Sequence, residues 1–111
     1  MQIHVTDPDG VAVVALEGDA MGGPDGTALI EHIRTLRADG QKRFVVDLHG
    51  VDRMNSSGLG MLIGALTTVR NADGHLVLAR VNERVRQLLT VTQLMSVFTL
   101  FDSVDEAVAS F

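Results

Sequence analysis

The chain has 111 residues and contains no cysteine, no tryptophan and no tyrosine. The absence of cysteine excludes disulfides, thiolate nucleophiles and cysteine-ligated metal sites. Tryptophan and tyrosine are the side chains that most often anchor tight protein interfaces. Any surface for a protein partner must therefore be built from methionine, leucine and backbone, and this composition predicts a modest, switchable affinity.

Basic residues are few as well. Nine Lys and Arg stand against 14 Asp and Glu, which gives a formal net charge of −5. Proteins that bind nucleic acid need a basic stripe to neutralise phosphates, and here the basic residues are scattered along the chain. The mild acidity also disfavours binding to an anionic membrane surface. The sequence therefore predicts neither nucleic acid nor a membrane as a partner.

Long apolar runs are missing too. No run approaches the roughly 20 residues that span a bilayer, and no basic leader followed by an apolar stretch opens the chain. We therefore expect a cytoplasmic protein. The length suits one domain, which we expect to span residues 1–111. The hydrophobic fraction of 46% is sufficient for a core without disulfides.

The apolar runs that are present alternate between the periods of strands and helices. The expected strands are residues 2–5, 11–16, 44–48, 75–79 and 97–101, and the expected helices begin at Pro24, near Ser57, after Asn82 and after Ser103. A turn-forming segment at residues 6–10, TDPDG, makes the first two strands a hairpin, while helices separate the later strands. This order predicts an α/β fold with a mixed, mostly parallel sheet, an N-terminal antiparallel hairpin and helical cover.

In sheets of this kind, the ligand or partner lies beyond the carboxyl ends of the parallel strands. Three connections should gather at that end, namely residues 18–23, 49–57 and 81–82. The first two of these are also the least ordinary stretches of the chain. We therefore expect the functional site there.

Residues 54–60, MNSSGLG, join a buried strand to a helix. At a helix start the amides lack partners and the helix dipole is positive, so a phosphate on Ser56 would be stabilised there. The alternative is that Asn55, Ser56 and Ser57 are only helix-capping residues, since all three are common at helix N-termini.

Two other interpretations, a nucleotide-binding site and a catalytic pair, have weaker support. Gly58, Gly60 and Gly64 form G-x-G-x-x-x-G, which is one residue longer than the dinucleotide fingerprint; these small residues better suit close helix packing or close approach of a partner. His49 and Ser56 lie on one loop and could form a catalytic pair, but no G-x-S-x-G elbow accompanies them.

Acidic and histidine residues add little to a catalytic hypothesis. Asp47 and Asp52 flank the loop as a possible carboxylate pair, yet Asp47 suits a cap for loop amides and Asp52 a solvated turn. The four histidines lack the spacing of a metal site. The sequence thus predicts no catalytic residue, no metal and no cofactor.

Methionines mark the remaining candidate surface. Met21 precedes two glycines, and Met61 falls off the apolar stripe of its helix. Methionine suits adaptable interfaces, so Met61 could face a partner. The alternative is that it packs under a neighbouring loop.

Four segments resemble one known family over essentially the whole chain: FVVDLHGVDRM, NSSGLGMLIGAL, TVRNADGHLVLARV and DSVDEAVASF. They are similar to the STAS domains of bacterial anti-sigma factor antagonists, and NSSGLG is the most specific part. The family pattern there is an acidic residue, Ser, Ser or Thr, then Gly-Leu-Gly.

The resemblance implies a partner-switching regulator of transcription and not an enzyme. Its partner would be an anti-sigma factor that is also a serine protein kinase of histidine-kinase-like ATPase fold, with a serine phosphatase as a further partner. The kinase modifies the serine after the acidic position, which is Ser56 here. The unmodified protein would bind the anti-sigma factor and displace the sigma factor, and phosphorylation would release it.

Two positions depart from the family pattern. Asn55 occupies the usual acidic position, and residues 18–21, GDAM, stand where antagonists often have Gly-Glu-Leu-Asp. Both departures fall on the expected partner face. We predict that this face comprises Asp19, Met21, Gly22, Asn55, Ser57, Gly58 and Met61. The alternatives are a constitutive STAS scaffold that is never phosphorylated and, less favoured, a small nucleotide-binding or hydrolytic domain.

Overall fold

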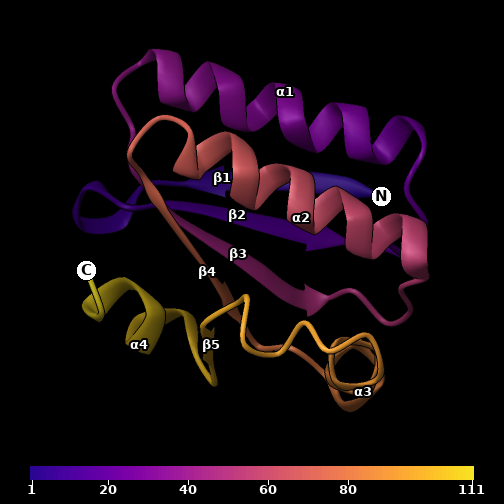
Figure 1. The fold of residues 1–111 in the computed structure, drawn as a ribbon. Helices are drawn as coiled ribbons and strands as arrows, with labels where there is room; N and C mark the ends of the chain where they lie inside the picture. Colours follow the sequence, from indigo (N-terminus) through magenta and orange to yellow (C-terminus); the bar gives the residue numbers. More distant parts are fainter.

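A computed structural model describes residues 1–111. The elements in chain order are β1 (Gln2–Thr6), a 3-10 turn (Pro8–Gly10), β2 (Ala12–Glu17), α1 (Pro24–Ala38), β3 (Arg43–Gly50), α2 (Ser56–Arg70), β4 (His75–Ala79), α3 (Glu83–Val91), β5 (Leu100–Phe101) and α4 (Val104–Ala109). Figure 1 shows their arrangement. The order and type of the strands and α-helices agree with the prediction from sequence.

One five-stranded sheet runs in the order β1-β2-β3-β4-β5. β1 pairs antiparallel with β2, and β3, β4 and β5 follow in parallel. The mixed sheet with an N-terminal hairpin is therefore confirmed. A parallel neighbour requires a crossover connection, and the helices between the later strands supply it.

Both faces of the central strands are covered, but unequally. α1 and α2 lie across one face, and the short α4 lies on the other (Figure 1). Val14 and Val46 belong to a core of 21 buried residues under α1 and α2, whereas Val13 and Val45 belong to a cluster of six under α4. Because alternate strand residues point to opposite faces, the all-apolar run of β2 is explained by cover on both sides.

The last strand is shorter than predicted. We expected residues 97–101, but only Leu100 and Phe101 form β5. The amide of Val97 donates to the carbonyl of Leu94 in a turn, and Phe98, which is 5% exposed, packs into the main core. An apolar run that looks like a strand is thus divided between a turn and an anchoring side chain.

One charged side chain is buried in the sheet. Asp47 near the end of β3 is 5% exposed, and Arg80, which follows β4, forms two hydrogen bonds with its carboxylate at 3.0 and 2.5 Å. The carboxylate also accepts a bond from the amide of His49 at 3.2 Å. The hydrogen bond to Asp47 raises the pKa of Arg80 above its ordinary value, in spite of desolvation. The expected amide-capping role of Asp47 is confirmed, with an ion pair in addition.

We predict that Arg80→Ala lowers the free energy of unfolding by about 2–3 kcal/mol, because it leaves the Asp47 carboxylate buried without its partner; we take less than the full cost since the Arg80 side chain is 39% exposed. Arg84→Ala is the matched control. Its pair with Asp52 is 3.4 Å long and largely solvated, so its loss should cost less than about 1 kcal/mol. Urea unfolding of both variants measures the difference, and equal losses would contradict the assignment.

Candidate functional site

The corner between β2 and α1 and the loop between β3 and α2 are joined through Ala20. Ala20 forms an isolated parallel bridge with Met54. Its amide donates to the carbonyl of Arg53 at 2.9 Å, and its carbonyl accepts from the amide of Asn55 at 3.4 Å. Two of the three expected connections therefore meet at the carboxyl end of the sheet, as the sequence predicted.

The third connection meets them through Asn82. Its side-chain amide donates to the carbonyls of Val51 and Asp52 at 3.0 and 3.1 Å, while its side-chain oxygen accepts from the amide of Val85 at 2.9 Å. Asn82 therefore caps α3, as predicted, and also ties the start of α3 to the loop that leads to Ser56.

Asn55 is the N-cap of α2. Its side-chain oxygen accepts the amide of Gly58 at 2.8 Å, and its backbone is extended, with φ −106°. Ser56 and Ser57 occupy the first two helical positions, and both are exposed. Of the three residues that could cap the helix, Asn55 takes this role, which leaves the Ser56 hydroxyl exposed at the helix start.

Gly58 and Gly22 allow the two loops to come this close. A Cβ on Gly58 would lie 1.9 Å from the carbonyl oxygen of Ala20, and a Cβ on Gly22 would lie 2.7 Å from the Cβ of Ser57. Gly22 also has a φ of +82°, which residues with a Cβ rarely adopt. The position of Ser56 thus depends on two glycines, Gly22 in the corner before α1 and Gly58 in the first turn of α2.

Gly60 differs from Gly58 because a Cβ there would meet nothing within 4 Å. It lines a groove of about 420 Å³ between α1 and α2, together with Gly26 and Ser57. The groove begins beside the Ser56 turn. Close packing explains Gly58 but not Gly60. At Gly64 a Cβ would make an ordinary contact with Ile30 at 3.5 Å, so the packing does not require glycine there either.

Two residues of the expected partner face point inward. Met61 is only 6% exposed, and a Cβ on Gly26 of α1 would lie 3.4 Å from its side chain. The expectation that Met61 faces solvent is therefore wrong, because the helix contact with α1 extends the buried stripe to include it. Gly58 is buried as well, so it supports the surface without forming part of it.

The other residues of that face are accessible. Met21 is 41% exposed, which makes it one of the few large apolar side chains at the surface. Asp19 pairs with Arg53 at 3.2 Å. Arg53 and Arg80 could not be identified from sequence, since nothing in the chain order shows which carboxylate an arginine on a neighbouring loop will reach.

The catalytic groups considered from sequence do not come together. No hydrogen bond joins His49 to Ser56, and Asp47 is bound to Arg80. No cluster of three His, Asp or Glu residues has the geometry for a metal ion. No helix has the length and apolarity needed to cross a membrane.

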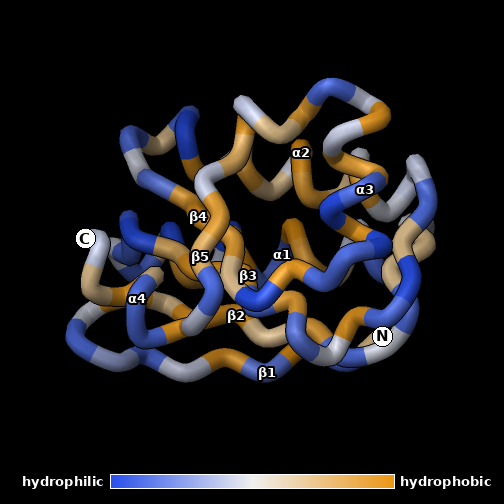
Figure 2. The backbone as a smooth tube through the Cα atoms, turned by 90° about the horizontal axis from the view of Figure 1, so that it is seen from below, coloured by the Kyte–Doolittle hydropathy of each residue, from blue (hydrophilic) through white to orange (hydrophobic).

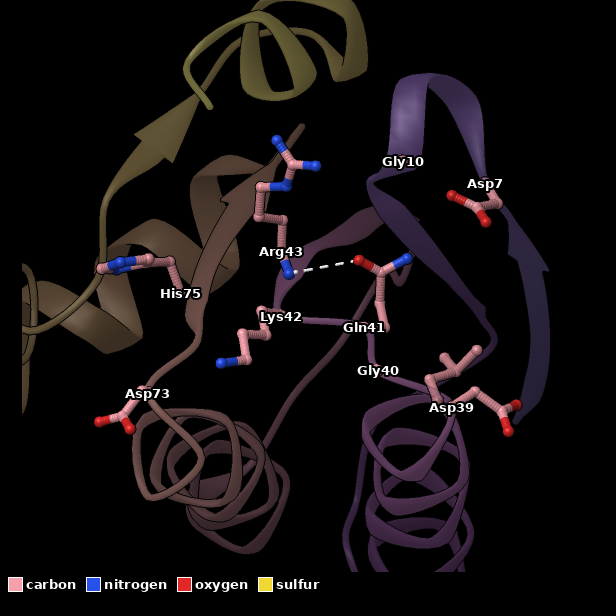
Figure 3. Close-up of a pocket in the computed structure, with 10 residues that line it drawn as sticks. Asp7, Gly10, Asp39, Gly40, Gln41, Lys42, Arg43, Asp73 and His75 are labelled. Carbon is pink, nitrogen blue, oxygen red and sulfur yellow. Dashed lines mark hydrogen bonds between the residues drawn. The ribbon is translucent and has the colours of Figure 1, made fainter.

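The largest cavity, about 740 Å³, lies at the opposite end of the sheet, where β3 and β4 begin. Figure 3 shows Lys42, Arg43 and His75 around it together with Asp7 and Asp73. Its polar lining mixes both signs of charge, and it contains none of the residues expected at the partner face. The cavity is therefore separate from the candidate site.

Comparison with known proteins assigns the fold. The family model of the STAS domain matches residues 2–107. The chain belongs to the STAS domain family. BtrV of Bordetella bronchiseptica, named as an anti-sigma factor antagonist, is 25% identical over 111 residues, which are 100% of this chain and 95% of BtrV.

Solved structures of this STAS domain's relatives agree. An anti-sigma factor antagonist from Mycobacterium paratuberculosis superposes with a TM-score of 0.82 at 27% identity, covering 98% of this chain and 92% of that chain. The phosphorylated form of SpoIIAA, a Bacillus cell fate determinant, has a TM-score of 0.75 at 16% identity over 98% of both chains, which shows a shared fold alone. This STAS domain is therefore similar in sequence and fold to proteins named as anti-sigma factor antagonists.

We predict that Gly58→Ala destabilises the protein by about 3 kcal/mol or more, because the new methyl group meets a backbone carbonyl that cannot move without breaking the loop pairing. Gly60→Ala is the matched control in the same helix. With open space around it, this variant should be neutral or gain up to about 1 kcal/mol from helix propensity. Thermal unfolding measures both, and similar stabilities for the two variants would contradict the packing described at Ala20.

A second prediction separates capping from the role of the serine. Asn55→Ala should cost about 1 kcal/mol, because the amide of Gly58 loses its acceptor. Ser56→Ala should change stability by no more than about 0.5 kcal/mol, as an exposed helical position allows. Denaturant unfolding distinguishes them, and a larger loss for Ser56→Ala would indicate that the serine is the structural cap.

Proposed function

We propose that this protein is a partner-switching module that binds an anti-sigma factor when Ser56 is unmodified and is released when Ser56 is phosphorylated. It acts as an interaction module in the cytoplasm and not as an enzyme. The observation that supports this most directly is the exposed Ser56 side chain at the first position of α2, with the capping role taken by Asn55. Family membership supplies the class of partner.

The proposed partner is an anti-sigma factor that is also a serine kinase of histidine-kinase-like ATPase fold, with a serine phosphatase reversing the modification. It would contact Met21, Ser56 and Ser57, and Asp19 at the margin. The open space above Gly60 leaves room for a partner side chain or backbone to approach α2 closely. An adaptable methionine and exposed backbone match the modest affinity that a reversible complex needs.

Phosphorylation would act through charge. A phosphoserine carries about −1.5 to −2 charges, and burying them in an interface without a matched cation costs several kcal/mol. Since about 1.4 kcal/mol corresponds to tenfold in affinity, a loss of a hundredfold or more follows. The free protein tolerates the phosphate, because the positive end of the α2 dipole stabilises an anion at this position. The fold need not move.

We predict that Ser56→Asp weakens binding to the anti-sigma factor at least tenfold, because it places a carboxylate in the interface, while Ser56→Ala preserves it. Thr67→Asp, an exposed position further along α2, is the control for charge alone and should bind as the unmodified protein does. Isothermal titration measures all three. Equal affinities for the Asp and Ala variants of Ser56 would contradict the switch.

The competing function is a constitutive STAS scaffold, which the neutral Asn55 in the acidic position favours. Incubation with the cognate kinase and ATP, followed by intact mass, separates the two. We expect one phosphate on the natural sequence and on Ser57→Ala, and none on Ser56→Ala. No phosphate on the natural sequence, or a phosphate that leaves partner binding unchanged, would favour the scaffold.

A further inference from the structure

One edge of the sheet is open along its whole length. β1 pairs with β2 through all five of its residues and is the first strand of the sheet, so no strand lies on its other side. In Figure 2, β1 runs along the lower margin of the molecule as alternating hydrophobic and hydrophilic residues. The unpaired N–H and C=O groups of such an edge are a template for another strand.

Proteins usually protect such edges with charged residues, proline, a bulge or a very short strand. β1 has the sequence QIHVT, which contains no Lys, Arg, Asp, Glu or proline, and its register with β2 is regular from Gln2 to Thr6. The strand at the opposite edge, β5, has only two residues and is too short to serve as such a template. The lack of protection is therefore specific to β1.

The side of β1 that faces α1 is apolar and incompletely covered. Ile3 and Val5 pair with Leu16 and Val14 of the main core, yet Val5 is 37% exposed. A cavity of about 550 Å³ lies between these two side chains and Ala28 of α1. An apolar side chain from a neighbouring strand would fill this space and cover Val5.

The sequence of β1 matches itself when reversed. If two copies pair antiparallel about a two-fold axis at His4, Ile3 of one copy lies opposite Val5 of the other, and Gln2 lies opposite Thr6. The apolar pair then falls on the α1 side and the polar pair on the other face, because alternate residues share a face. Such self-complementarity is what a two-fold interface requires.

The strand itself contributes no charge that would oppose pairing of two copies. The chain carries a net charge of −5, but β1 itself has no formal charge with histidine neutral. The carboxylate nearest to the proposed axis is that of Glu17 on β2, which lies 3.8 Å from His4 and is 59% exposed. The α1 rim of the cavity contributes one carboxylate, that of Glu31, beside the uncharged side chain of Thr35.

We propose that the protein forms a symmetric homodimer through antiparallel pairing of two β1 strands centred on His4, which joins two five-stranded sheets into one of ten. One strand pair and a shallow cavity make a small interface compared with the roughly 1,200–2,000 Å² of stable complexes. The dimer should therefore be weak and depend on concentration. Each dimer would carry two copies of Ser56. The dimer does not depend on whether Ser56 is phosphorylated.

Sedimentation velocity over a concentration series tests the dimer. The natural sequence should shift from monomer to dimer as concentration rises, and Val5→Lys should remain monomeric, because a charge in the strand pair blocks association. Val91→Lys is the matched control, since Val91 is 74% exposed on α3 and the change in net charge is the same. The proposal would be overturned if the natural sequence stays monomeric at millimolar concentration, or if Val91→Lys weakens the dimer as much as Val5→Lys does.

Disulfide trapping tests the register and does not depend on Val5→Lys folding. In a chain without cysteine, His4→Cys should give a cross-linked dimer on mild oxidation, since directly opposite Cα atoms in an antiparallel pair are about 4.5–5.5 Å apart. Gln2→Cys alone should not cross-link, but a mixture of Gln2→Cys with Thr6→Cys should. If Gln2→Cys alone cross-links as fast as His4→Cys, this pairing is ruled out. It is also ruled out if neither variant cross-links.

Discussion

The candidate site depends on one close contact, that of Gly58 with the carbonyl of Ala20. Only a residue without a Cβ fits there, and the contact seats the first turn of α2 on the corner that leads from β2 into α1. The Ala20–Met54 bridge and the Asn55 amide bond complete the joint. Because these bonds use the backbone, they are independent of the side chains at the surface. The accessible residues can therefore vary without disturbing the geometry.

The other side of the same loop is fixed by polar side chains from the β4–α3 connection. Arg80 binds the buried carboxylate of Asp47 in two places, and the Asn82 side chain holds the carbonyls of Val51 and Asp52. Between the backbone joint and these bonds, the loop before Ser56 has little freedom to move. A rigid presenting surface agrees with a switch that works through added charge instead of a conformational change.

The fold could be predicted from sequence because its signals are local. A turn-rich TDPDG segment, apolar periods and the capping residues Asn82 and Ser103 each specify their own element, and the order of elements then limits the topology. The prediction of a strand over residues 97–101 was wrong because this apolar run resembles a strand, whereas the Phe98 side chain in fact packs into the core. Local pattern cannot decide between those two ways of burying the same side chain.

The site was predictable in part. Ser56 and the gathering of the loops follow from the position of NSSGLG after a parallel strand, since carboxyl ends share one edge. Met61 and the two arginines were not predictable, because their environment is set by contacts between elements distant in the chain. Whether Met61 faces α1 or solvent depends on how α1 crosses α2, and the pairing of Arg80 with Asp47 depends on the adjacency of β3 and β4.

The neutral residue before Ser56 has a consequence for the proposed switch. An acidic N-cap would place a permanent carboxylate beside the modification site, so the unmodified face would already carry a negative charge. With Asn55 as the cap, the first turn of α2 contains no acidic residue. The cap is retained because an amide oxygen accepts the Gly58 bond as a carboxylate would. A phosphate would then be the only anion at this helix start, stabilised by the dipole in the free protein and unfavourable in an interface. In the proposed switch, phosphorylation would therefore take this helix start from no acidic charge to the full charge of the phosphate.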